Sequence, residues 1–408
     1  MGVLDGIRVV DLTRYLSGPT ATMMLADMGA DVIKVEGLPG GDPARQSGKE
    51  VGGETVYFLA SNRNKRSLAL NLRTEAGRAL CRRLISRADV VVENFKPGVV
   101  EKMGLDWTAC AALNERLVYC SITGFGRIGI GASLPGFDQT VQAMSGLMSV
   151  TGTSETGPLR VGIAIADSAT GVFSAYGIVA ALFNRERSGR GQFVDCSLMA
   201  SMLSLMSYQA QRYLSASEVP GQDGNDHPIM FPQGTFRTQS GAVTIACGNE
   251  DMWRRLCIAL SLTSLSEDER FKSNALRMEN RAELRKLLEA KLGEGNSAFW
   301  LQRISEAGVP CGPVLSVSEA LEHQVTAELG MVRRATHSSL GTMRLLGRAV
   351  HIAGDDGSGE SSPEDDWLRL APPLLGEHSA EICREARYSE EEIASMLTDG
   401  IIKLPARP

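Results

Sequence analysis

The sequence predicts an α/β fold, with a large Rossmann-like parallel-sheet domain and a smaller α+β domain. Short apolar runs alternate with stretches of helical spacing near the N-terminus, as in successive βαβ units. The 408 residues exceed the size at which one hydrophobic core keeps growing, so we expect two domains. A net charge of -6 disfavours a nucleic-acid or membrane-surface protein, although local basic clusters could still hold an anionic ligand.

The first half of the chain predicts strands and helices in alternation. A strand, a helix with Pro19 near its first turn and a second strand form the first βαβ unit. Strands joined in this way lie parallel, so we expect a sheet of the nucleotide-binding type. The expected elements are strands at 7–12, 30–36, 89–93 and 117–121 and helices at 19–29 and 74–88.

The second half predicts a domain change at the Gly, Pro, Asn and Asp cluster of residues 219–228. We therefore expect the N-terminal part of the large domain at 1–218, a small domain at 226–325, and a C-terminal segment, 326–408, that returns to the large domain. The small domain should hold a hairpin turning at 239–241 and helices near 250–260, 281–292 and 297–307. The C-terminal segment should hold an acidic loop at 355–366 and a last helix that begins at a Ser389/Glu392 capping box.

Asp167 follows the apolar, strand-like run 162–166 and precedes the helical spacing of residues 171–183. We therefore expect its carboxylate at or near a helix N-cap, held rigidly and partly out of water. One interpretation is a capping residue, because Asp is favoured at N-caps. The other is a carboxylate nucleophile, which attacks an activated carbonyl without a general base. Since no histidine precedes His227, a site built from the first half of the chain must work without imidazole.

The eight cysteines are scattered, form no CxxC pair and have no nearby histidines at metal-ligand spacing. We expect reduced thiols in the core and no metal site. The N-terminus shows no signal-peptide pattern, and we expect no membrane span and a cytoplasmic protein.

Two further motifs are ambiguous. Residues 124–129 match G-x-G-x-x-G, but the residues that follow still have loop composition, so we expect a flexible loop near the site and not a dinucleotide fold. The basic residues within 62–67 and 93–98, with Arg73 and Lys102, are either solvated surface charges or a phosphate-binding group at the carboxyl edge of the sheet.

Ordered sequence blocks run through nearly the whole chain. They begin with the run Leu4 to Thr13, the pair Gly18-Pro19 and the run Leu25 to Glu36. The later blocks are Asn64 to Ser67, Glu93 to Phe95, Pro97-Gly98, Ser121 to Gly126, Asp167-Ser168, Gly308 to Val314 and Leu375 to His378. Together they resemble the class III CoA-transferases, the family of formyl-CoA:oxalate and carnitine CoA-transferases.

The resemblance implies an interlocked homodimer of two ring-shaped chains. It also implies that Asp167 takes up the acyl group and then CoA as covalent intermediates, with CoA and acyl-CoA as substrates and no permanently bound cofactor. The residues implied to contact CoA are Arg14, Leu70, Arg73, Asn94, Phe95, Lys102 and Met103. Those implied near the reacting carboxylate are Leu16, Asp138, Gly221, Gly224 and His227, the last three on a mobile glycine loop.

Departures from the family pattern bear on the substrate. Leu16 stands where the formyl-CoA enzyme has glutamine, which makes oxalate and formate less expected as substrates. Arg14 and His227 could pair with a distal carboxylate, so we expect a small dicarboxylic acid such as succinate, carried by an acyl-CoA donor.

Two other functions stay open. An α-methylacyl-CoA racemase would need a histidine where this chain has Phe137, and without it one of the two proton-transfer bases is missing. A CoA-binding protein without catalytic activity would have no need of Asp167.

Overall fold

A computed structural model describes residues 2–352 and 367–405, so the predicted acidic loop at 355–366 lies outside the described residues. The chain forms two compact units. The large unit comprises residues 1–148, 160–219 and 324–408, as far as these are described, and the small unit comprises 149–159 and 220–323.

The large unit contains a sheet that, within the described residues, has seven strands in the order β10-β7-β6-β1-β2-β5-β16. All neighbouring strands run parallel except β16, which pairs antiparallel with β5 at one edge. The prediction of an α/β fold with a mostly parallel sheet is therefore confirmed. The strands are β1 (Arg8–Asp11), β2 (Asp31–Gly37), β5 (Lys65–Leu70), β6 (Val90–Glu93), β7 (Val118–Thr123), β10 (Phe193–Ser197) and β16 (Ile402–Lys403).

The strand order reverses between β1 and β6. From β1 the chain builds outward through β2 and β5, and it then returns to the other side of β1 to add β6, β7 and β10. The loops that leave the carboxyl ends of β1 and β6 therefore turn in opposite directions. This reversal creates the crevice in which open α/β sheets bind their ligands.

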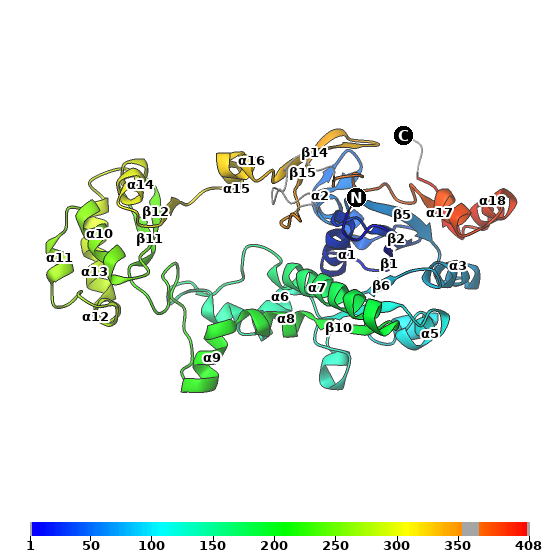
Figure 1. Cartoon of the computed structure of the whole chain (residues 1–408), viewed down its shortest axis with the longest axis horizontal. Coiled ribbons are helices and arrows are strands. Elements are labelled where there is room, and N and C mark those ends of the chain that lie inside the picture. The colour runs from blue at the N-terminus through cyan, green and yellow to red at the C-terminus, as the bar shows by residue number, and fades with distance from the viewer. Residues whose placement is uncertain (1, 353–366, 406–408) are drawn as a thin grey trace. The chain divides into compact units, whose positions relative to one another are not determined.

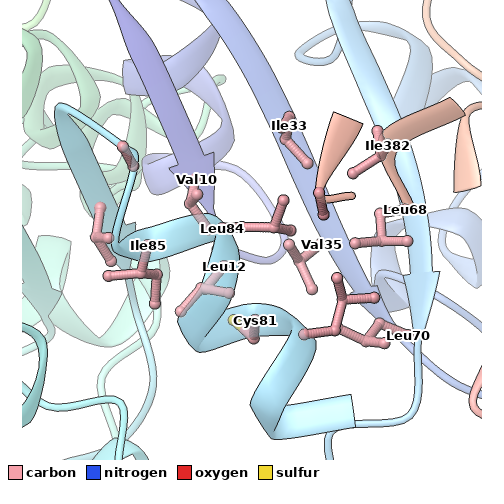
Figure 2. Packing of buried hydrophobic residues seen from close by; sticks show 14 of the residues in the cluster. Val10, Leu12, Ile33, Val35, Leu68, Leu70, Cys81, Leu84, Ile85 and Ile382 are labelled. Carbon is pink, nitrogen blue, oxygen red and sulfur yellow. The ribbon is translucent and has the colours of Figure 1, made fainter. Parts of the chain in front are cut away.

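Helices cover both faces of the sheet. Alternate strand residues point to opposite sides, so the apolar strands supply buried side chains to a core on each face. Val10, Ile33 and Leu68 belong to a core cluster with α3 (Glu75–Ile85), α5 (Trp107–Leu113), α17 (Ser379–Glu385) and α18 (Glu390–Thr398), part of which Figure 2 shows. Their neighbours Val9 and Val32 face a second cluster with α1 (Ser17–Asp27), α7 (Ile165–Ser188) and α8 (Leu198–Leu205). Figure 1 shows α1 and α7 side by side.

Helix α7 has the length and hydropathy of a membrane span, contrary to the expectation that no segment does. One side of it, including Ala175, Ile178 and Leu182, is buried against the sheet. We therefore assign it as a core helix of the large unit.

The structure corrects two local expectations. The run 162–166 is not a strand: the chain is irregular up to Ala164, the N-cap, and α7 begins at Ile165, which puts Asp167 inside the first helical turn. Two of the three basic residues within 62–67 are neither solvated nor available for phosphate. Arg63 and Lys65 are buried and paired with Asp27 and Asp11.

The remaining elements of the large unit are short. Two small antiparallel pairs are β3 (Glu50–Val51) with β4 (Glu54–Thr55) and β14 (Val332–His337) with β15 (Gly341–Leu346). The last helix, α18, begins at the predicted capping box. The other helices are α2 (Val56–Leu59), α4 (Val99–Met103), α6 (Asp138–Met144), α9 (Ser207–Ala216) and α16 (Gln324–Glu328).

The small unit has its own core, built around Phe231, Trp253 and Trp300. Its antiparallel sheet consists of β11 (Gln233–Arg237), β12 (Ala242–Ala246) and β13 (Cys311–Pro313). The predicted hairpin is present, and Gly241 supplies the positive φ of 84° at its turn. The other elements are β8 (Gly152–Thr153), β9 (Gly157–Pro158), α10 (Glu250–Ala259), α11 (Ser264–Glu267), α12 (Asn274–Glu279), α13 (Arg281–Leu292), α14 (Ser297–Glu306) and α15 (Val317–Glu322).

Replacing Ile33 by alanine tests the role of the central sheet. Its side chain is fully buried between strands and helices, so Ile33→Ala should lower the free energy of unfolding by about 2–5 kcal/mol. The exposed Val3→Ala should change it by less than about 0.5 kcal/mol. Urea unfolding followed by circular dichroism gives the comparison, and equal midpoints for the two variants would contradict this packing.

Candidate active site

A cavity of about 170 Å³ lies at the carboxyl ends of β6 and β7 and contains Asp167. The loop after β1, the loop after β6 and the glycine-rich loop after β7 all contribute to its wall. Its lining residues are Arg14, Tyr15, Ser17, Tyr57, Asn94, Phe95, Lys96, Pro97, Ile122, Thr123, Gly124, Phe125, Gly126, Gly131, Ala132, Leu134, Gly136, Phe137, Asp167 and Leu198. We call it the Asp167 cavity.

A second cavity, of about 750 Å³, lies at the ends of β1, β2 and β5. Its wall includes residues 35–43, Arg73 and Met103, and we call it the large cavity. Arg14 and Phe95 line both cavities, and the Arg14 guanidinium lies 4.5 Å from the centre of the Phe95 ring. The two cavities therefore adjoin at the crevice between β1 and β6.

Asn94 fixes this junction. Its Oδ1 accepts a hydrogen bond from the Arg14 main-chain N–H at 2.9 Å, and its Nδ2 donates to the Arg14 carbonyl at 2.8 Å. One amide side chain on the β6 loop thus satisfies both polar main-chain groups of a residue on the β1 loop. Glu93 steadies the same loop, because its Oε2 accepts from the Phe95 N–H at 2.8 Å.

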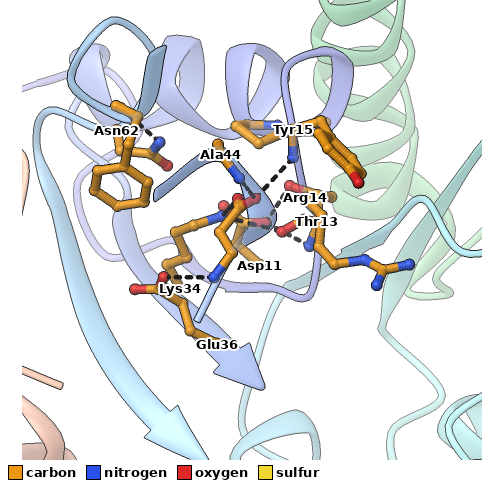
Figure 3. Close-up of polar contacts among 12 residues, drawn as sticks. Asp11, Thr13, Arg14, Tyr15, Lys34, Glu36, Ala44 and Asn62 are labelled. Atoms are coloured by element: carbon orange, nitrogen blue, oxygen red, sulfur yellow. Dashed lines mark hydrogen bonds and ion pairs between the residues drawn. The ribbon is translucent and has the colours of Figure 1, made fainter. Parts of the chain in front are cut away.

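Buried charges hold the turn that carries Arg14 and Tyr15 (Figure 3). Lys34, which is fully buried, donates to the Thr13 carbonyl at 3.0 Å and pairs with Asp42 at 2.9 Å. Asp42 accepts from the N–H of Tyr15, whose φ is 64°. Burial alone would raise the pKa of Asp11 and lower that of Lys34, but the surrounding opposite charges outweigh it and shift both pKa values toward the charged forms.

Asp138 contacts the first turn of α7 from the neighbouring helix. Its Oδ1 accepts from the main-chain N–H groups of Ala166 at 2.8 Å and Asp167 at 3.3 Å, and its Oδ2 accepts from Gln142 at 2.7 Å. The carboxylate therefore uses two of the N–H groups that a helix N-terminus leaves free. Asp138 is itself the first residue of α6, and its side chain caps α7.

The Asp167 carboxyl is partly buried beside this second acid. Burial, with the Asp138 charge adding to it, raises the pKa of Asp167 to about 6, and a hydrogen bond with Ser17 opposes the shift. Above that pH Asp167 is an ionised, poorly solvated carboxylate inside a small cavity. Such a group has the properties of a nucleophile.

Three lining residues were missed by the sequence analysis as parts of a site around Asp167. Burial and the charge of Asp167 raise the pKa of Tyr57 to about 12, so its hydroxyl stays a hydrogen-bond donor. Tyr15 lies edge-on to Phe137 with ring centres 6.1 Å apart. Lys96 belongs to a motif already singled out for its charge, but nothing in the pattern around Tyr57 or Tyr15 marks either as a site residue.

The predicted CoA contacts are divided between several places. Arg14, Arg73, Phe95 and Met103 line the large cavity, and Asn94 lines the Asp167 cavity. The other two predicted CoA contacts, Leu70 and Lys102, line neither cavity, and neither does Leu16, which was predicted near the reacting carboxylate. Leu70 is fully buried in the core, and Leu72 lines the large cavity instead. Lys102 is exposed on α4. Tyr15 and Ser17, on either side of Leu16, line the Asp167 cavity.

The predicted glycine loop belongs to the small unit. The Gly224 N–H donates to the Gly152 carbonyl at 2.8 Å, and φ at Gly224 is 61°. Arg281 pairs with Asp223 at 2.9 Å and Arg285 pairs with Asp226, so two ion pairs tie the loop to α13. His227 accepts from the Ile229 N–H at its Nδ1, and Gly221 has open space around its Cα.

The chain is similar to known proteins over nearly its whole length. The sequence profile of CoA-transferase family III matches residues 4–379. Succinyl-CoA:glutarate CoA-transferase of Mus musculus is 37% identical over 405 residues, which cover 99% of this chain and 91% of that protein. Acetyl-CoA:oxalate CoA-transferase of Acetobacter aceti is 38% identical over 385 residues, with coverage of 94% and 96%. The crystal structure of a CAIB/BAIF family protein from Brucella suis has a TM-score of 0.82 at 38% identity, with coverage of 94% and 99%.

Asp138→Asn separates the charge of Asp138 from its capping role. Asparagine keeps an oxygen that accepts from the α7 N–H groups but carries no charge, so the pKa of Asp167 should fall by roughly one unit. A carbon-13 NMR titration of labelled Asp side chains measures the shift, and the exposed Asp399→Asn serves as the control. An unchanged or higher pKa in Asp138→Asn would show that the two carboxylates do not interact.

Proposed function

The chain belongs to CoA-transferase family III, and we propose that it moves CoA from an acyl-CoA such as succinyl-CoA to a short carboxylic acid, with Asp167 as the nucleophile. The observation that carries the proposal is the partly buried Asp167 carboxylate in a small cavity that adjoins a much larger one. A thioester is open to attack by such a carboxylate, whereas the acceptor acid is not activated on its own. The enzyme therefore needs a covalent relay.

The relay has two steps in each direction. A carboxylate oxygen of Asp167 attacks the thioester carbonyl carbon, the C–S bond breaks, and CoA thiolate leaves an aspartyl-acyl anhydride. The thiolate then attacks the aspartyl carbonyl carbon, which releases the donor acid as a carboxylate and leaves an aspartyl-CoA thioester. The acceptor carboxylate attacks this thioester, and the same steps in reverse release the new acyl-CoA and regenerate Asp167.

The two cavities suit the two parts of the acyl-CoA substrate. We assign the nucleotide end of CoA to the large cavity, where Arg73 is available for a phosphate, and the acyl group to the Asp167 cavity. The pantetheine arm then passes Arg14 and Phe95, which line both. A cavity of about 170 Å³ favours a short acyl chain.

Tyr57 is the side chain best suited to stabilise a developing oxyanion. The N–H groups of Ala166 and Asp167 already donate to Asp138, so these two donors at the start of α7 are not free to stabilise the oxyanion of the reacting carbonyl. The Tyr57 hydroxyl lines the same cavity and is held in its protonated form.

Both covalent intermediates hydrolyse in water, so the site must be kept dry during turnover. The family resemblance implies a mobile glycine loop at 220–228 for this task. Within the small unit, Gly224 has a positive φ, and ion pairs of Asp223 and Asp226 tie the loop to α13.

The racemase alternative lacks a base. The position where a racemase would need histidine is Phe137, and among the described residues that line the Asp167 cavity there is no histidine. A CoA-binding protein without activity would have no need of a partly buried carboxyl that lines this cavity.

Intact-protein mass spectrometry tests the nucleophile. Mixing the enzyme with succinyl-CoA should add a CoA-sized mass, and hydroxylamine should convert the adduct to a hydroxamate that peptide mapping locates at Asp167. Asp167→Ala should slow transfer at least about 10³-fold, because the nucleophile is lost. The variant should still bind CoA. No adduct with succinyl-CoA, acetyl-CoA or other donors, or full turnover by Asp167→Ala, would refute the assignment.

We also propose that two chains form a homodimer, which the family resemblance implies to be interlocked. The outer side of α7 carries large apolar side chains at Val172, Tyr176, Val179 and Phe183, which are 49%, 73%, 43% and 68% exposed. Their spacing of four, three and four residues puts them on one side of the helix. A continuous apolar stripe of this kind indicates a surface that another protein covers.

Light scattering coupled to gel filtration tests the dimer. The wild-type chain should elute with twice the mass of one chain, and the double variant Tyr176→Asp, Phe183→Asp should shift toward the monomer or aggregate. Ile258→Asp places one such charge at an exposed apolar side chain on α10 of the small unit and should leave the mass unchanged. A monomeric wild-type protein would contradict the proposal.

A further inference from the structure

Ser17 lies against the Asp167 carboxyl inside the Asp167 cavity. It is the first residue of α1, it is only 4% exposed, and both residues line the cavity. The Ser17 hydroxyl donates a hydrogen bond to the carboxylate, which lowers the pKa of Asp167 against the opposing effects of burial and of Asp138. This hydroxyl does not cap its own helix, because the N-cap of α1 is Leu16 and no side chain caps that helix.

The close contact of α1 with α7 brings Ser17 and Asp167 together. The two helices lie side by side (Figure 1). Gly171 follows Asp167 by four residues on α7, so the two lie on the same side of that helix. A Cβ atom at Gly171 would lie only 2.8 Å from the Ser17 carbonyl oxygen and 2.8 Å from the Thr20 Cβ. Because Gly171 has no side chain, the start of α1 can approach the side of α7 that carries Asp167.

Buried polar contacts fix the start of α1. Lys65 donates to the Pro19 carbonyl at 2.9 Å, and the Thr22 hydroxyl donates to Asp11 at 2.7 Å. Lys65, Thr22 and Asp11 are all fully buried. The Ser17 hydroxyl is therefore held in place before any substrate binds, and a donor that needs no rearrangement stabilises a developing charge most effectively.

The proposed reaction attacks two different carbonyl carbons. Asp167 first attacks the thioester carbonyl of the substrate, where Tyr57 can stabilise the oxyanion. The CoA thiolate, and later the acceptor carboxylate, attack the carbonyl carbon of Asp167 itself. One Asp167 oxygen becomes the bridging oxygen of the anhydride and leaves with the donor acid. The other stays a carbonyl oxygen in both intermediates, and it receives the electron pair of the C=O bond at each attack on the aspartyl carbon.

We propose that Ser17 is a catalytic residue whose hydroxyl holds this retained oxygen of Asp167 and stabilises the oxyanion that forms on it when the aspartyl carbonyl is attacked. The inference rests on the proposed function, because it concerns intermediates formed on Asp167. The hydroxyl keeps its proton throughout, and the oxyanion returns its electron pair to the C=O bond when the carboxylate or thiolate leaves. The N–H groups of Ala166 and Asp167 donate to Asp138, so they do not supply this hydrogen bond.

Discharge of the isolated Asp167-CoA adduct measures attack on the aspartyl carbonyl directly. The adduct is formed with succinyl-CoA, freed from excess ligand and mixed with succinate, and mass spectrometry follows the loss of the CoA-sized mass. Ser17→Ala should slow discharge about 10- to 100-fold, the value of a hydrogen bond to a charged group, because the oxyanion loses its donor. Binding of succinyl-CoA should be unchanged, since Ser17 contacts the reacting carboxyl and not the CoA.

The pH dependence of adduct formation gives a second measurement. The other titratable or charged residues around Asp167 are Asp138 on α6 and the cavity residues Arg14, Tyr15, Tyr57 and Lys96. All of them are still present in Ser17→Ala. The rate should rise with pH around the Asp167 pKa of about 6 in the wild type, and at higher pH in the variant, because a bond that favours the ionised carboxylate is lost.

Two further variants separate the hydroxyl from the packing at Ser17. Ser17→Thr keeps the hydroxyl and should retain most of the discharge rate. Ser174→Ala removes a fully buried serine of α7 that lines neither cavity and should behave as wild type. Unchanged discharge in Ser17→Ala, or an equal loss in Ser17→Ala and Ser17→Thr, would overturn the proposal. Failure of the wild-type enzyme to form the adduct would instead refute the proposed function, so the two failures are distinguishable.

Discussion

The buried ion pairs at the carboxyl ends of β1 and β2 are the interaction on which the site depends. Lys34 is fully removed from water, so its charge is tolerated only because Asp42 and the Thr13 carbonyl surround it. Breaking one half of such a pair costs about 3–5 kcal/mol, since it leaves the other charge buried and alone. The pairs thus impose one conformation on the turn, including the positive φ of Tyr15.

The conformation of this turn also positions residues that line both cavities. The turn carries Arg14, Asn94 ties Arg14 to the loop after β6, and that loop carries Phe95 and Lys96. Because β1 and β6 flank the point at which the sheet order reverses, their loops would otherwise diverge. The amide of Asn94 holds the two loops together at the place where the large cavity and the Asp167 cavity adjoin.

Much of the fold could be predicted because the sheet is regular. The βαβ spacing near the N-terminus and the capping box at Ser389 depend on local sequence, and both appear in the structure. The prediction of a strand-like run at 162–166 was wrong, because a short apolar run does not distinguish a buried strand from the segment before a helix. Arg63 and Lys65 were predicted as surface or phosphate-binding charges, but each is paired with a buried aspartate. These partners lie 36 and 54 residues away, and no local pattern reveals such contacts. Asp167 could be singled out from its neighbours in sequence, whereas Tyr57 reaches the same cavity only through the tertiary fold.

The placement of Asp138 resolves a conflict in the chemistry of Asp167. A nucleophilic carboxylate reacts faster when it is poorly solvated, but strong burial would protonate it and remove its reactivity. With the pKa raised to about 6, the carboxylate is still ionised by about ten to one at pH 7. Asp138 contributes to this shift while its own charge is stabilised by the N–H groups of the α7 terminus. The helix terminus therefore stabilises the neighbouring acid, and the Asp167 side chain, which carries no such bond from α7, stays available to the thioester.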